Sequence, residues 1–141
     1  MKVEFTPEQD ALRTELRTYF GKLMRPELQA ESADSMGEGG GPLWREALRQ
    51  MGRDGWIGVG WDKEFGGKGM SPIEQFIFVE EVMRAGYSFP FLTTESVGPQ
   101  LAAVGNDWQK KEIVPKILAG ECLVAIGYSE PGAGTDLAAL K

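Results

Sequence analysis

The residues best suited to hold a ligand lie near the C-terminal end of the sequence, at positions 122–136 (CLVAIGYSEPGAGTD). An apolar run comes first, and a turn containing Gly132 and Gly134 follows it. Glycines let a backbone come close to a flat or anionic group. Ser129, Thr135 and the free N–H groups of the turn can donate hydrogen bonds to such a group. The pattern predicts a buried strand that opens onto a glycine-rich turn, either as a ligand site or as a turn shaped by geometry alone.

Acid–base chemistry has few candidate groups, because the sequence contains no histidine. His-based triads and His metal sites are therefore excluded, and carboxylates are the remaining ordinary acid–base groups. Glu80 and Glu81 are adjacent, but neighbouring residues on a helix do not face each other, which favours solvated carboxylates over a catalytic pair. The single cysteine, Cys122, cannot form an internal disulfide, and its apolar surroundings predict a buried, unreactive thiol.

The composition of the 141 residues is that of one soluble globular domain. A net charge of −6 argues against nucleic acid as a partner, since no basic patch is available to neutralise phosphates. No apolar run approaches the roughly 18 residues of a membrane span. Residues 1–5 lack the apolar core of a signal peptide.

Helices are predicted to precede the strand, and three capping boxes mark where helices begin. The boxes are Thr6 with Gln9, Ser71 with Glu74, and Asn106 with Gln109. Capping signals, apolar spacing and glycine stops predict helices over about 7–24, 42–53, 72–85 and 94–104, and a fifth from 107 that Pro115 disturbs. Residues 31–41 are predicted to form a loose, exposed loop, and residues 64–69 a tight turn.

Three blocks of this sequence resemble the acyl-CoA dehydrogenases, in order and at suitable separations. Residues 64–69 (EFGGKG), followed by Glu80 and Glu81, are similar to the family's E-(Y/F)-G-G-x-G … E-E segment. Residues 105–121 (GNDWQKKEIVPKILAGE) are similar to its G-x-x-x-Q-K-x-x-x-(L/V)-P-x-(L/I)-x-x-G-E segment. Residues 129–136 (SEPGAGTD) are similar to its flavin-binding signature, T-E-P-x-A-G-S-D. The first 63 residues match mainly by helical pattern.

The resemblance implies a mainly α fold with two parts. Residues 1–121 would form the family's N-terminal helical bundle domain. Residues 122–141 would be the first strand and flavin-binding turn of the middle domain, which is β-barrel-like. Members of the family are two to three times longer than this chain, end in a further four-helix domain and assemble as tetramers. A homo- or hetero-tetramer is therefore expected.

The resemblance also implies FAD as cofactor and assigns contacts to it. The expected FAD contacts are Ile126, Gly127, Tyr128, Ser129, Gly134 and Thr135. Ser129 occupies the place of the usual threonine and keeps its hydroxyl for the flavin. Gly134 and Thr135 would meet the FAD phosphates, and Thr135 would also lie near the CoA part of the substrate. Tyr128 departs from the pattern, since a small apolar residue is common there.

The reaction implied by the resemblance is α,β-dehydrogenation of an acyl-CoA thioester, as in β-oxidation of lipids. A carboxylate base removes the α-proton while a hydride leaves for the flavin. In the family this base is a glutamate of the C-terminal domain, so no catalytic residue is named within these 141 positions. Electron-transfer flavoprotein is the expected electron acceptor, and the bacterial cytoplasm is the expected location. The first predicted helix and the following residues 23–27 (LMRPE) are together similar to dehydrogenases of actinobacterial steroid side-chain breakdown, some of which are heteromers.

Two alternative functions remain open at this point. The chain could be a non-catalytic fragment or a partner subunit of a heteromeric dehydrogenase, since its one predicted strand has no neighbour to pair with. It could also belong to an acyl-CoA oxidase, a flavoenzyme of the same fold that differs mainly in how oxygen reaches the flavin.

Overall fold

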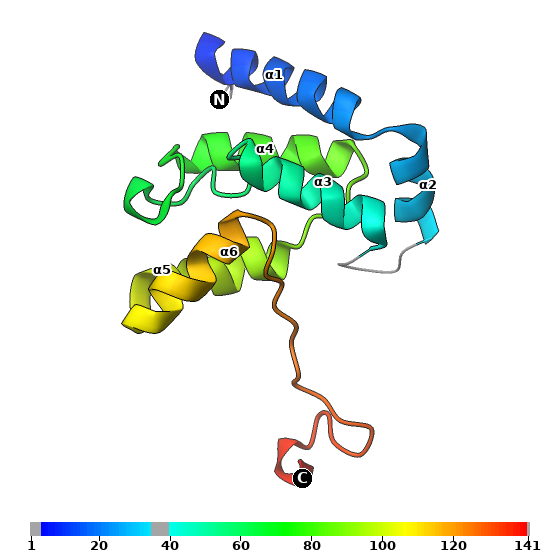
Figure 1. Cartoon of the computed structure of the whole chain (residues 1–141), viewed down its shortest axis with the longest axis vertical. Coiled ribbons are helices and arrows are strands. Elements are labelled where there is room, and N and C mark those ends of the chain that lie inside the picture. Colours follow the sequence, from blue (N-terminus) through cyan, green and yellow to red (C-terminus); the bar gives the residue numbers. More distant parts are fainter. Residues whose placement is uncertain (1–3, 35–39, 141) are drawn as a thin grey trace.

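The computed structural model describes residues 4–34 and 40–140, and helices dominate it (Figure 1). The longer α-helices are α1 (Pro7–Leu23), α2 (Pro26–Asp34), α3 (Pro42–Arg53) and α4 (Pro72–Arg84). The shorter helices are the 3-10 turns η1 (Lys63–Phe65) and η4 (Leu137–Ala139), the π-helices η2 (Leu92–Val97) and η3 (Gln109–Ile113), and the α-helices α5 (Gly98–Val104) and α6 (Val114–Leu118). The predicted mainly α fold is confirmed.

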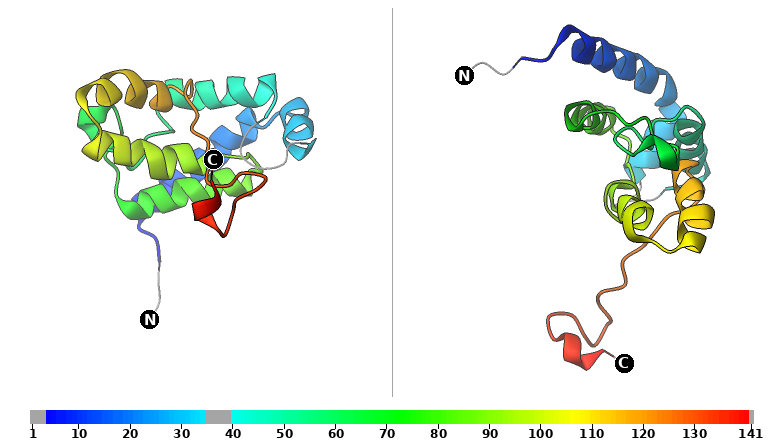
Figure 2. Two further views of the ribbon diagram at one scale, coloured as in Figure 1. Left: turned by 90° about the horizontal axis from the view of Figure 1, so that it is seen from below. Right: turned by 90° about the vertical axis from the view of Figure 1, so that its left-hand side faces the viewer.

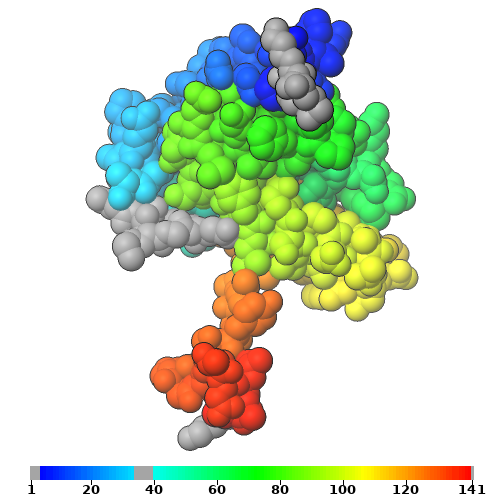
Figure 3. All heavy atoms as spheres, turned by 180° about the vertical axis from the view of Figure 1, so that it is seen from behind, coloured from blue at the N-terminus to red at the C-terminus, as the bar shows by residue number. Residues whose placement is uncertain are grey.

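The helices are arranged in layers. Helix α1 lies over α3 and α4, and α5 and α6 form a pair on the opposite side of these two helices (Figures 1 and 2). Residues 122–140 leave this helical body near the end of α6 and project from it as a narrow stalk (Figure 3). No helix among the described residues is both long enough and apolar enough to span a membrane.

Two apolar clusters hold the helices together. The larger cluster lies between α1, α3 and α4 and is built around the fully buried aromatic side chains Phe20, Trp44, Phe78 and Phe89. Phe78 and Phe89 meet edge to face with their centroids 5.2 Å apart, an arrangement that aromatic pairs prefer. The smaller cluster lies under α5 and α6. Its buried members are Trp61, Ala102, Val114 and Ile117.

All three predicted capping boxes are confirmed. In the first, the Gln9 N–H donates to the Thr6 hydroxyl and the Thr6 N–H donates to Gln9 Oε1. The boxes at Ser71 and Asn106 show the same exchange of hydrogen bonds. These pairs satisfy N–H groups that a helix start leaves without partners.

Helix α2 was not predicted from the sequence. Helix α1 ends close to the predicted position, and Pro26 then occupies the first helical position of a second helix, where its missing N–H costs nothing. The predicted loop over residues 31–41 is therefore wrong up to residue 34, and its glycine-rich part at 35–39 lies outside the described residues. Glu31 of α2 has a capping role, because its carboxylate accepts from the N–H groups of Leu43 and Trp44 at the start of α3.

The predicted strand at the start of the 122–136 region is not formed within the described residues. Residues 121–129 are extended but pair with no other strand, and a single bridge joins Glu130 to Ala133. A strand needs a neighbour to complete its hydrogen bonds, and none of the described segments supplies one. The burial expected for this segment is likewise absent, since Ile126 is 51% exposed and Tyr128 74% exposed. Cys122, predicted to be buried, is half-buried.

Candidate functional site

The predicted ligand-binding residues all lie on the projecting segment. Ile126, Gly127, Tyr128 and Ser129 follow one another along its extended part, and Gly134 and Thr135 lie beyond the turn. Each of these six residues is exposed. The segment therefore presents them on one continuous stretch of chain outside the helical body (Figures 1 and 3).

The turn brings the two halves of this stretch together. The Glu130 N–H donates to the Ala133 carbonyl at 2.7 Å, and the Ala133 N–H donates back at 3.1 Å. This closure places the Ser129 hydroxyl oxygen 3.9 Å from the position that a Cβ on Gly134 would take. Two of the six predicted residues, distant by five positions, are thus neighbours in space. Asp136 then begins η4, where its carboxylate accepts from the Ala138 N–H.

The glycines leave room for a ligand beside the backbone. A Cβ built at Gly127 or Gly132 would meet no atom within 4 Å beyond its chain neighbours. A flat group can therefore approach this backbone, and the hydroxyls of Ser129 and Thr135 are available as donors. The residues present fit the polar edge of a flavin.

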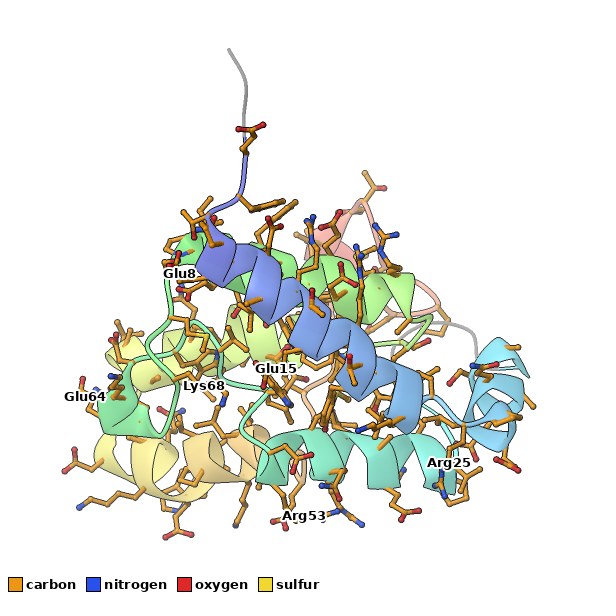
Figure 4. All side chains as sticks on the ribbon, turned by 90° about the horizontal axis from the view of Figure 1, so that it is seen from above. Glu8, Glu15, Arg25, Arg53, Glu64 and Lys68 are labelled. Carbon is orange, nitrogen blue, oxygen red and sulfur yellow. The ribbon has the colours of Figure 1, made fainter. Side chains whose placement is uncertain are left out.

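The glycine-rich block at residues 64–69 is a tight turn, as predicted. Gly66 and Gly69 adopt φ values of +93° and +62°, a left-handed conformation that disfavours other residues. Glu64 lies on η1 at the edge of the molecule, and Lys68 places its ammonium 4.6 Å from the ring centroid of Trp56 (Figure 4). The block therefore shapes the body between α3 and α4.

The interpretation of Glu80 and Glu81 as solvated carboxylates is wrong for Glu81. Its side chain is only 1% exposed and lies against Arg13 and Arg17 of α1. Glu80 pairs with Arg13 and is about one third exposed. The two carboxylates thus hold α1 on α4 and leave no free acid for catalysis at this position.

A pocket of about 240 Å³ lies between the turn after α3, α4 and α5. Its lining includes Trp61, Gln75 and Glu95, and the amide of Gln75 donates to Glu95 Oε2 at 2.7 Å. Burial raises the pKa of the Glu95 carboxyl, and the hydrogen bonds it accepts oppose this rise. Among the described residues, no group of three His, Cys, Asp or Glu side chains is placed to hold a metal ion.

Sequence reasoning missed one contact, which joins Thr93 to the projecting segment. The Val124 N–H donates to the Thr93 hydroxyl at 2.9 Å, and that hydroxyl lies 3.4 Å from the Val124 carbonyl oxygen, to which it donates. Apolar spacing cannot reveal such a contact, because Thr93 is a polar residue buried at the edge of a helix.

Comparison with known proteins matches residues 6–121 to a family described as "Acyl-CoA dehydrogenase, N-terminal domain". Acyl-CoA dehydrogenases FadE26 and FadE29 of Mycobacterium tuberculosis are each 51% identical to the chain over its whole length. The chain spans 36% of the length of each of these relatives.

Solved structures give the same result. The ChsE4–ChsE5 complex from Mycobacterium tuberculosis superposes with a TM-score of 0.85 at 50% identity, covering all of this chain and 35% of its counterpart. The Tcur3481–Tcur3483 steroid acyl-CoA dehydrogenase superposes with a TM-score of 0.85 at 46% identity, covering 99% of this chain and 36% of its counterpart. The resemblance of the three sequence blocks is thereby confirmed, and the chain belongs to the acyl-CoA dehydrogenase family.

Proposed function

We propose that this chain is the helical part and first flavin-binding segment of an FAD-dependent acyl-CoA dehydrogenase, acting on acyl-CoA thioesters of lipid or steroid side-chain breakdown. The observation that carries the proposal is the exposed stretch 126–135, which presents Ser129, Thr135 and open glycine backbone beside a helical body that belongs to this family. The division at residue 121, between a helical domain and the start of a β domain, is part of the proposal.

The chain's own residues would contribute binding and orientation. The Ser129 hydroxyl would donate to the flavin ring, and the backbone of residues 126–128 would lie along it. Gly134 would admit the FAD phosphates close to the backbone, while Thr135 would donate to them and to the CoA part of the substrate. When bound, FAD supplies the acceptor for the hydride that leaves the β-carbon. No residue of these 141 is assigned as the base.

The steroid substrate class is supported by two similar structures, a steroid acyl-CoA dehydrogenase and a variant of it. Electron-transfer flavoprotein is proposed as the electron acceptor, and the bacterial cytoplasm as the location. Exposed apolar side chains on the segment, including Leu123, Ile126 and Tyr128, support a covering partner, which would be further chain or another subunit.

The test is anaerobic reduction of the full-length gene product. The purified protein is expected to be yellow, and its flavin absorbance is expected to bleach when a steroid side-chain acyl-CoA is added. Ser129→Ala should weaken flavin binding or slow reduction, and Ser129→Thr should restore both because it keeps the hydroxyl. A colourless full-length protein that gains no flavin on incubation with FAD contradicts the proposal.

A second candidate is a partner subunit that carries no flavin of its own. Two of the similar structures are described as pairs of different proteins, which supports this alternative. Co-expression with a candidate partner dehydrogenase subunit separates the two functions. Flavin that co-purifies with this chain alone supports the enzyme. Flavin that is bound only by the complex, and whose binding Ser129→Ala does not change, supports the partner subunit.

A further inference from the structure

Thr93 is the residue through which the helical body holds the segment that carries the proposed flavin contacts. One hydroxyl engages both backbone polar groups of Val124, accepting from its N–H at 2.9 Å and donating to its carbonyl at 3.4 Å. Thr93 itself is 1% exposed. The hydroxyl therefore replaces the hydrogen bonds that a neighbouring strand would otherwise give to Val124.

The buried core holds the backbone beside Thr93 in place. The indole N–H of the buried Trp61 donates to the Thr94 carbonyl at 3.0 Å, next to Thr93 in η2. The π-helical turn that carries Thr93 is therefore anchored to the core, and π-turns are frequent at functional sites.

The contact lies close to the proposed site along the chain. Val124 precedes Ile126 by two residues, a distance of about 7 Å in an extended backbone. Residues 125–132 are exposed, so the helical body does not bury the flavin-contacting stretch directly. A shift at Val124 would therefore move Ile126 and the residues that follow it.

We infer that Thr93 is a positioning residue for the flavin: its hydroxyl clamps Val124 and thereby sets where residues 126–129 meet the cofactor. The effect on flavin binding rests on the proposed function, whereas the contact between Thr93 and Val124 rests on the two hydrogen bonds alone. Thr93 touches neither cofactor nor substrate in this role.

The experiment uses the full-length gene product with Thr93→Val, which keeps the shape of the side chain and removes the hydroxyl. Amide hydrogen exchange is followed on peptides covering residues 122–129, and the Kd for FAD is measured by titration of the apoprotein. Thr93→Val removes two hydrogen bonds to a partly buried backbone. We therefore expect the amide exchange rate at Val124 and the Kd for FAD each to rise about tenfold or more. Thr93→Ser should stay within about threefold of the wild type in both measurements.

Thr94→Val is the matched control, because Thr94 is equally buried and its hydroxyl donates to the nearby Pro90 carbonyl. It should leave exchange at 122–129 and the Kd for FAD within about threefold of the wild type. Equal effects of Thr93→Val and Thr94→Val, or no effect of Thr93→Val on either measurement, would overturn the inference. Thr93→Ala serves in place of Thr93→Val if the valine variant does not fold. A wild-type protein that binds no FAD defeats the proposed function, while the exchange measurement still tests the clamp.

Discussion

Arg17 Nε of α1 lies 2.9 Å from Glu81 Oε2 of α4, and this ion pair joins two residues that are 64 positions apart in the chain. Arg13 approaches the other carboxylate oxygen at 3.4 Å, and Arg84 comes within 3.8 Å. Glu81 is nearly inaccessible, whereas Arg17 keeps half of its side chain exposed. The carboxylate has left water and depends on these cations, while the cations remain hydrated in part.

Replacing Glu81 should therefore destabilise the helical body. Glu81→Gln removes the charge and keeps the shape, leaving Arg13 and Arg17 without their buried partner. We expect the free energy of unfolding to fall by about 2 kcal/mol, the range for hydrogen bonds to charged groups. The loss in the free energy of unfolding is measured by urea titration, with unfolding monitored by circular dichroism.

Glu80→Gln is the matched control for Glu81→Gln. Glu80 is the neighbouring carboxylate, also pairs with Arg13, and is about one third exposed. Exposed pairs contribute little, so its replacement should cost less than about 1 kcal/mol. Equal losses in the two variants would contradict the role given to burial.

The buried Glu81 also shows where sequence reasoning stops. Adjacent glutamates on a helix point in different directions, which was correct, but only the packing of α1 decides that one of them is covered. Local signals performed better, since a capping box such as Ser71 with Glu74 lies within four residues and its geometry is set locally. The strand predicted at the start of the 122–136 region likewise depends on distant residues, because pairing needs a neighbour that local sequence cannot supply.

Glu31 is expected to stabilise α3 by capping it from α2. Its Oε1 accepts from the Trp44 N–H at 2.6 Å and its Oε2 from the Leu43 N–H at 3.3 Å, at a helix start whose own N-cap, Gly41, has no side chain. A carboxylate there satisfies free N–H groups and favours the positive end of the helix dipole. Glu31→Ala should lower the free energy of unfolding by about 1–2 kcal/mol. The exposed Glu46→Ala, within α3 itself, should change it by less than about 0.5 kcal/mol in the same unfolding experiment.

Glu95 is expected to make stability depend on pH. Burial raises the pKa of its carboxyl in the folded state, so its charged form costs stability at neutral pH. That cost disappears as the pH falls through the folded pKa to the unfolded value of 4.5. Glu95→Gln should therefore melt at a higher temperature than the wild type at pH 7, and the difference should vanish near pH 4.

Glu74 provides a control of opposite sign for the pH experiment. The backbone N–H and the hydroxyl of Ser71 donate to its carboxylate and lower its pKa. Its charged form therefore adds stability above the unfolded pKa, and this is lost as the pH falls through the folded pKa. Glu74→Gln should melt below the wild type at pH 7 and approach it at low pH. Parallel shifts in the two variants would contradict both assignments.

Gly98 and Gly21 are expected to respond oppositely to alanine, although both lie in helices. A Cβ at Gly98 would come within 2.5 Å of Trp61 Cζ2, and that ring is buried and cannot yield. Gly98→Ala should cost about 1–3 kcal/mol, the range for overpacking a core. A Cβ at Gly21 in α1 meets nothing within 4 Å, so Gly21→Ala should gain up to about 1 kcal/mol from helix propensity. Thermal unfolding of the two variants beside the wild type decides this, and a stabilising Gly98→Ala would show that Trp61 does not fix the position of η2 and α5.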